Sequence, residues 1–224
     1  MLVSGLQLWS LVSVGALLTL IIYLIVAQAR VSAERQAGFR EWAVHAGFTY
    51  SEGPVDPNTL LPFQALQPHD RGINAQYATN IATGHRGPVR ITVFDLYQRS
   101  THGGEDDIDH AVTTTDHSTI AVLHIPTLEL PHFRCVIFGK AFTGHVEPHT
   151  IQLNPGCLLQ ATDPESLRRL FTPALLAVLE KLEGFTIVGD DSYILIEHAG
   201  KTALAGLDAF LQSATAIAGH LASP

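Results

Sequence analysis

The stretch THGGEDDIDHAVTTTDH, from Thr101 to His117, holds three histidines and five acidic residues between two apolar runs. Carboxylates and imidazoles at close spacing are the ligands that hard and borderline divalent cations select. The stretch therefore suggests a metal site, with His102, Asp109, His110 and His117 as candidate ligands. The competing interpretation is a solvated acidic loop that connects two strands.

Known metal-binding templates do not fit this stretch. A calcium loop starting at Glu105 would place Asp107 and Asp109 correctly, but His110 falls where the sharp turn needs glycine. The three histidines have no recognised spacing for a transition metal. The acidic loop is therefore the favoured interpretation, and the metal site is the alternative.

Other catalytic motifs are incomplete. The chain has no GxSxG elbow and no GxGxxG, and Ala141 follows the lysine of GKAFTG where a phosphate loop needs Ser or Thr. The HVEPH cluster, 145–149, lacks the PCxxC partner of a zinc deaminase. The sequence thus indicates a domain without a cofactor and without an assembled catalytic centre.

The N-terminal segment indicates whether this domain is attached to a membrane. Residues 1–29 carry no charge, and the apolar run from Leu6 to Ala27 would span about 33 Å as a helix. A cleaved signal peptide is the alternative, because Ala27-Gln28-Ala29 has the form of a cleavage site. The absence of a basic n-region favours a retained transmembrane anchor, residues 1–29, with the lipid bilayer as the partner of residues 6–27.

Charge asymmetry predicts the orientation of the anchor. Arg30, Arg35 and Arg40 follow the apolar run and nothing basic precedes it, so the C-terminal domain is expected in the cytoplasm. All of the net charge of −8 lies after Ala29. A domain of that charge is repelled by phosphate backbones, so a nucleic-acid partner is not expected.

The two cysteines, Cys135 and Cys157, do not have the CxxC spacing of a zinc or redox site. Buried free thiols are expected in the cytoplasm. If the domain is exported, a Cys135–Cys157 disulfide is the alternative.

A juxtamembrane helix, residues 30–47, is expected to connect the anchor to the domain. Phe39, Trp42, Ala43 and Ala46 recur at offsets 0, 3, 4 and 7, which is one face of a helix. Gly47 supplies the stop. Trp42 is therefore expected to dock this helix on the domain.

Residues 48–224 predict an α+β domain, a mostly antiparallel β-sheet with late helices packed on it. A hairpin is expected from INAQYATNIATG and VRITVFDLYQ, followed by strands at STIAVLHI, FRCVIFG and HTIQL. A second hairpin is expected to turn at Gly189-Asp190-Asp191. The predicted helices cover 164–171, 173–182 and the amphipathic run from Leu204 to Leu221.

FREWAVHAGFTY, VRITVFDLYQ, STIAVLHIP and SLRRLFTPALLAVLEKLEGFTIVGDDSYILI resemble, in order and spacing, a family of uncharacterised bacterial single-pass membrane proteins. In that family an N-terminal spanning helix precedes a "WA…G" juxtamembrane motif, an antiparallel sheet and late helices. The resemblance implies a shared fold and a shared mode of anchoring, and it brings no catalytic residues.

The sequence as a whole predicts a membrane-anchored, non-catalytic binding or scaffolding domain with a protein partner. The alternative is a metal-dependent enzyme that uses the loop 101–117.

Overall fold

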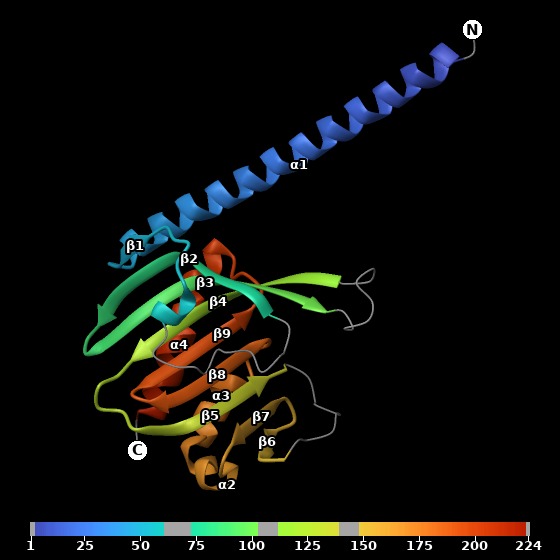
Figure 1. Ribbon diagram of the computed structural model, residues 1–224. Coiled ribbons are helices and arrows are strands. Elements are labelled where there is room, and N and C mark those ends of the chain that lie inside the picture. Colours follow the sequence, from blue (N-terminus) through green and yellow to red (C-terminus); the bar gives the residue numbers. More distant parts are fainter. Residues whose placement is uncertain (1–2, 61–72, 103–111, 139–147, 223–224) are drawn as a thin grey trace.

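The computed structural model describes residues 3–60, 73–102, 112–138 and 148–222, in which a long helix projects from a sheet domain (Figure 1). That helix is α1 (Val3–His45). The strands are β1 (Thr49–Ser51), β2 (Ile73–Arg86), β3 (Val89–His102), β4 (Val112–His124), β5 (Leu130–Ile137), β6 (Thr150–Asn154), β7 (Cys157–Ala161), β8 (Phe185–Asp191) and β9 (Tyr193–Ala199). The expected α+β class, with an apolar N-terminal helix, an antiparallel sheet and late helices, is confirmed.

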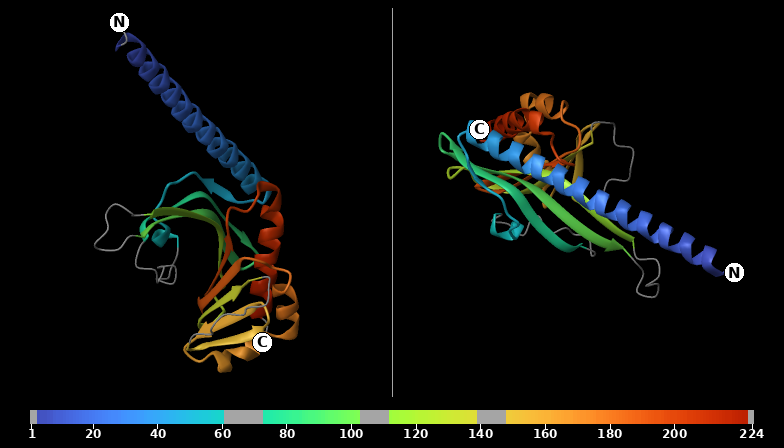
Figure 2. Two further views of the ribbon diagram at one scale, coloured as in Figure 1. Left: turned by 90° about the vertical axis from the view of Figure 1, so that its right-hand side faces the viewer. Right: turned by 90° about the horizontal axis from the view of Figure 1, so that it is seen from above.

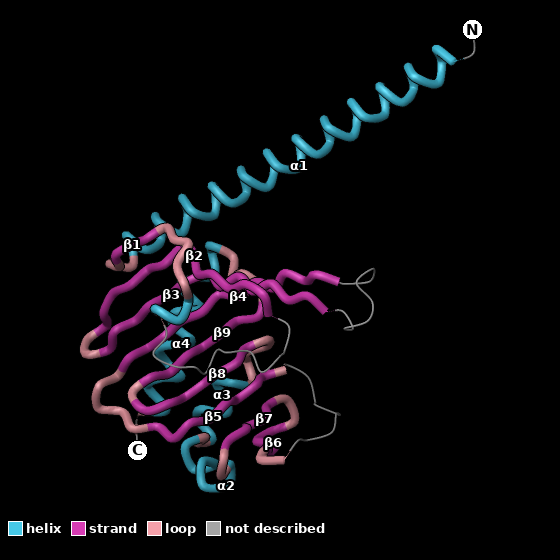
Figure 3. Tube along the Cα trace, viewed as in Figure 1, coloured by secondary structure: helices cyan, strands magenta, loops and turns pink. Residues whose placement is uncertain are grey.

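The nine described strands form one antiparallel sheet in the order β1-β2-β3-β4-β9-β8-β5-β7-β6 (Figure 3). The late hairpin β8–β9 lies between β4 and β5, at the centre of the sheet. β9 pairs with β4 only over Thr119–His124, while β3 and β4 continue pairing as far as His102 and Val112. This extension, residues 97–102 of β3 and 112–117 of β4, is called the arm.

Five helical segments follow β7, namely α2 (Pro164–Leu167), η4 (Arg168–Leu170), α3 (Pro173–Leu179), η5 (Leu204–Gly206) and α4 (Leu207–Leu221). Two of them, α2 and α3, begin at the capping side chains that the sequence predicts. Asp163 accepts a hydrogen bond from the Ser166 amide, and Thr172 accepts one from the Leu175 amide. The first two helices are shorter than predicted, because the chain tightens into a 3₁₀ turn after Leu167 and α3 ends at Leu179.

Apolar residues form a core on each face of the curved sheet. α3 and α4 cover one face, and η1 (Pro57–Thr59) lies on the other (Figure 2). The larger core, on the helical face, includes the buried side of α4, which confirms its predicted amphipathic pattern. The smaller core on the opposite face consists of Ala78, Ile81, Phe94, Leu96, Ile120, Val122, Val188 and Leu195.

The last turns of α1 dock on the domain as predicted. Phe39, Trp42 and Ala43 are buried, and the indole N–H of Trp42 donates a hydrogen bond of 2.9 Å to Asp208 of α4. Gly47 ends the helix with φ of +76°, a left-handed conformation that glycine adopts readily. α1 runs without a break through the expected boundary between residues 29 and 30.

The structure corrects three expectations. The prediction of a loop over residues 101–117 is wrong at both ends of that range. Thr101, His102 and residues 112–117 lie in strands, because the β-branched run at 113–115 pairs with β3. The predicted turn at residues 189–191 lies within β8, where a Cβ on Gly189 would come within 2.2 Å of the Phe133 ring. The strand β7 was not predicted from the sequence.

Candidate functional site

The structure describes two of the four proposed metal ligands. His102 pairs with Val112 at the end of the arm, and His117 pairs with Tyr97 at its base. These positions are five residue pairs apart, about 17 Å at roughly 3.3 Å per residue. Asp109 and His110 lie outside the described residues. The described residues contain no group of three His, Cys, Asp or Glu that could hold a metal ion, and the four-residue hypothesis stays a prediction.

His117 belongs to an aromatic cluster at the base of the arm. Its ring meets Tyr97 edge to face at 4.6 Å, and Tyr97 stacks on Tyr77 at 4.7 Å. The Lys201 ammonium lies 4.5 Å from the centre of the Tyr97 ring, a cation–π contact. Burial, and then the charge of Lys201, lower the pKa of His117 below its ordinary value. His117 is therefore held as a neutral ring at neutral pH.

A shallow groove of about 550 Å³ lies beside this cluster. It opens where β9 ends and Gly200, with φ of +82°, turns the chain away from β4. The last backbone link is the hydrogen bond of 2.8 Å that the Gly200 amide donates to the His117 carbonyl. The groove is lined by Gln98, Thr115, Asp116, His117, Ser118, Glu197, Ala199, Gly200 and Lys201.

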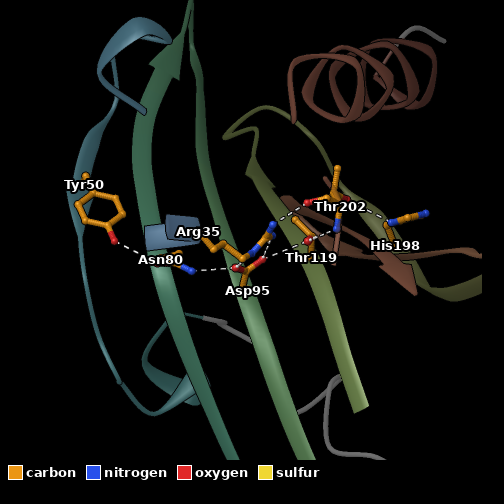
Figure 4. Close-up of polar contacts among 7 residues, drawn as sticks. All are labelled: Arg35, Tyr50, Asn80, Asp95, Thr119, His198 and Thr202. Carbon is orange, nitrogen blue, oxygen red and sulfur yellow. Dashed lines mark hydrogen bonds and ion pairs between the residues drawn. The ribbon is translucent and has the colours of Figure 1, made fainter. Parts of the chain in front are cut away.

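A buried polar cluster lies between α1 and the sheet, and no sequence pattern predicted it. Asp95, in the middle of β3, is fully buried and receives two hydrogen bonds from Arg35 of α1, at 2.6 and 2.7 Å (Figure 4). Asn80 donates to the same carboxylate at 2.9 Å and Thr119 at 3.1 Å. Both carboxylate oxygens are thus satisfied, which a buried charge requires.

The cluster extends from α1 to the segment before α4. The Arg35 guanidinium also donates to the Thr202 carbonyl at 2.8 Å, and the Thr202 amide donates to the Thr119 hydroxyl at 2.9 Å. The Thr202 hydroxyl lies 3.1 Å from Nδ1 of His198, and Tyr50 donates to Asn80 at 3.0 Å. The network fixes the helix α1 to three adjacent strands, β2, β3 and β4, and to the segment before α4.

Cys135 and Cys157 face each other across β5 and β7. Both are buried and free, and their sulfur atoms lie 2.9 Å apart. The hydrogen bond with Cys157, together with burial, raises the pKa of the Cys135 thiol well above its usual range. The Cys135 thiol is therefore not set up as a nucleophile.

Comparison with known proteins supports the fold. No family model matches the chain, and no curated protein matches it in sequence. The crystal structure of the mycobacterial trehalose monomycolate transport factor A, TtfA, is similar, with a TM-score of 0.57 and 12% sequence identity. The alignment covers 84% of this chain and 94% of that chain. At this identity the likeness shows a shared fold.

The helix α1 is the one described segment long and apolar enough to cross a membrane. Its side chains over residues 15–26 are exposed in the domain structure, as expected of a membrane anchor. This agrees with the single-pass architecture that the sequence predicted.

Proposed function

We propose that this protein is a membrane-anchored, non-catalytic factor whose sheet domain binds another protein at the membrane. The observation that carries the proposal is the buried Arg35–Asp95 network, which fixes the helix α1 to β2, β3 and β4 of the sheet. A buried ion pair is costly to desolvate and is best explained by a need for one defined arrangement. A rigid connection holds the domain in a fixed pose relative to the bilayer.

Two further observations support a binding role. The described residues hold no metal cluster and no assembled catalytic constellation. The similar fold of TtfA belongs to a protein described as a transport factor. A factor that assists other membrane proteins fits an anchored domain with this architecture.

Site-specific photo-crosslinking in cells tests the proposal. A photo-crosslinking amino acid is placed at exposed positions spread over the domain, namely Glu41, Arg90, Arg99, Glu129, Glu165 and Glu180. We expect at least one position to give a discrete adduct with a membrane protein, identified by mass spectrometry. The proposal falls if no position gives an adduct. It also falls if untagged protein holds stoichiometric metal that a His110→Ala, His117→Ala variant loses, because that result favours the metal-dependent enzyme.

A further inference from the structure

We infer that the uncovered edge of β4 in the arm binds an extended, basic peptide of another protein as an added β-strand. The inference rests on the proposed binding function and gives the chemistry of the partner. Peptides recognised in this way gain affinity from backbone hydrogen bonds and specificity from alternate side chains.

The edge arises because β9 stops short of the arm. β9 covers β4 over Thr119–His124, and a parallel bridge joins Ser118 to Gly200. Within the part of the chain that the structure describes, no strand pairs with this side of β4 over residues 112–116. The groove beside β4 lies along the same edge, so an added strand has room to enter.

The alternation of residues along β4 determines which of its backbone N–H and C=O groups point to this edge. The His117 carbonyl accepts a hydrogen bond from Gly200, so His117 directs its backbone toward the β9 side. Alternate residues of an antiparallel strand direct their backbone groups to the same neighbour. Thr115 and Thr113 therefore direct their N–H and C=O groups to this edge. The run VTTT contains none of the lysines or prolines with which proteins commonly block an edge.

Acidic side chains outnumber basic ones around the groove, which favours a basic partner, because the lining cation Lys201 contacts the Tyr97 ring. Asp116 and Glu197 both line the groove, and neither forms an ion pair among the described residues. Glu197 pairs with Ile120, which is four residues along β4 from Asp116, so both carboxylates lie on the same face of the sheet. Lysine or arginine at alternate positions of an added strand would meet both carboxylates.

A second copy of the chain does not fit this edge. Antiparallel pairing of two β4 edges needs a two-fold axis perpendicular to the strands. The arm and the N-terminal end of α1 extend to the same side of the sheet (Figures 1 and 2). Such a dimer would point its two anchors away from each other along the strand direction, instead of holding them side by side in one bilayer. The occupant is therefore a strand from a different protein.

Peptide binding to the full chain tests the inference. The protein is placed in nanodiscs of uncharged phosphatidylcholine and titrated with a short peptide that alternates Lys and Val. We expect saturable binding, with slower amide hydrogen exchange at residues 113 and 115. An analogue N-methylated along its pairing edge should bind at least about tenfold more weakly, because it loses strand hydrogen bonds. A Glu–Val analogue should also bind more weakly.

Charge-reversal variants give the matched comparison. Asp116→Lys with Glu197→Lys should weaken binding at least about tenfold, while Glu129→Lys, an exposed change in the connection between β4 and β5, should not. Equal binding of the N-methylated peptide, or absence of binding by the Lys–Val peptide, overturns the inference. If the cellular adduct forms but excess peptide does not compete with it, the binding function stands and this edge is not its site.

Discussion

At the scale of single residues, Asp95 is the group on which the attachment of the anchor depends. Its carboxylate is fully buried and is neutralised by Arg35 from a helix that lies 60 residues away in sequence. Removing the cation would leave a buried charge with only the Asn80 and Thr119 donors. Such an uncompensated charge is far more costly than a lost surface contact.

We therefore predict that Arg35→Ala lowers the free energy of unfolding by about 3 to 5 kcal/mol. Chemical denaturation of the full chain in detergent, followed by far-UV circular dichroism, measures the loss. An Arg35→Met, Asp95→Leu variant should lose less, because it removes both charges together.

The exposed pair Arg40–Glu52 gives the matched control. Both side chains are about half exposed, so Arg40→Ala should change stability by only about 0 to 1 kcal/mol. If Arg40→Ala lowered the free energy of unfolding as much as Arg35→Ala, burial of an ion pair would not determine how much it contributes to stability.

At the scale of elements, α1 is both anchor and domain helix. Its last turns pack Phe39 edge to face on Trp42, with ring centres 5.2 Å apart, and Trp42 in turn contacts Phe48. Gly38 lies so close to Leu204 of η5 that a Cβ would come within 2.3 Å of it. This packing, together with the Arg35 network, makes the helix part of the core.

Trp42→Ala should lower the free energy of unfolding by about 3 to 5 kcal/mol, because it opens a cavity and removes the hydrogen bond to Asp208. Val44 lies two residues away on the exposed side of the same helix, and Val44→Ala should stay within about 0.5 kcal/mol. The same denaturation experiment compares the two. Similar losses would mean that α1 does not dock as described.

At the scale of the whole molecule, the expected orientation in the membrane rests on the few arginines that follow the apolar run. Arg35 is engaged by Asp95 and Arg40 is paired with Glu52 at the surface, and the exposed Arg30 directly follows the apolar run. Positive residues beside a spanning helix favour the cytoplasmic side.

We predict that a green fluorescent protein fused after Pro224 fluoresces and that alkaline phosphatase fused there stays inactive. Cys135 and Cys157 should then both react with an alkylating reagent once the protein is denatured without reductant, because the cytoplasm keeps thiols reduced. Active phosphatase, or a bridged cysteine pair, would place the domain outside.

The amino-acid sequence by itself determined the elements whose signals are local. The apolar run of α1, its Gly47 stop, the caps at Asp163 and Thr172 and the buried face of α4 all depend on neighbours within a few residues. The α+β class followed from the order of these elements. Of the candidate site, the sequence singled out His117 but not its partners Tyr97 and Lys201.

Only the tertiary structure decided which distant residues meet. In the sequence, Asp95 is a charged residue within an apolar strand, and Arg35 is one of the basic residues that predict membrane orientation. Only the folded sheet brings their side chains into contact. The edge of β4 that no described strand covers likewise arises because β9, which ends at Ala199 more than 80 residues further along the chain, pairs with β4 only from Thr119 onward. Contacts of this kind depend on strand pairing and register over long separations, which no local pattern encodes.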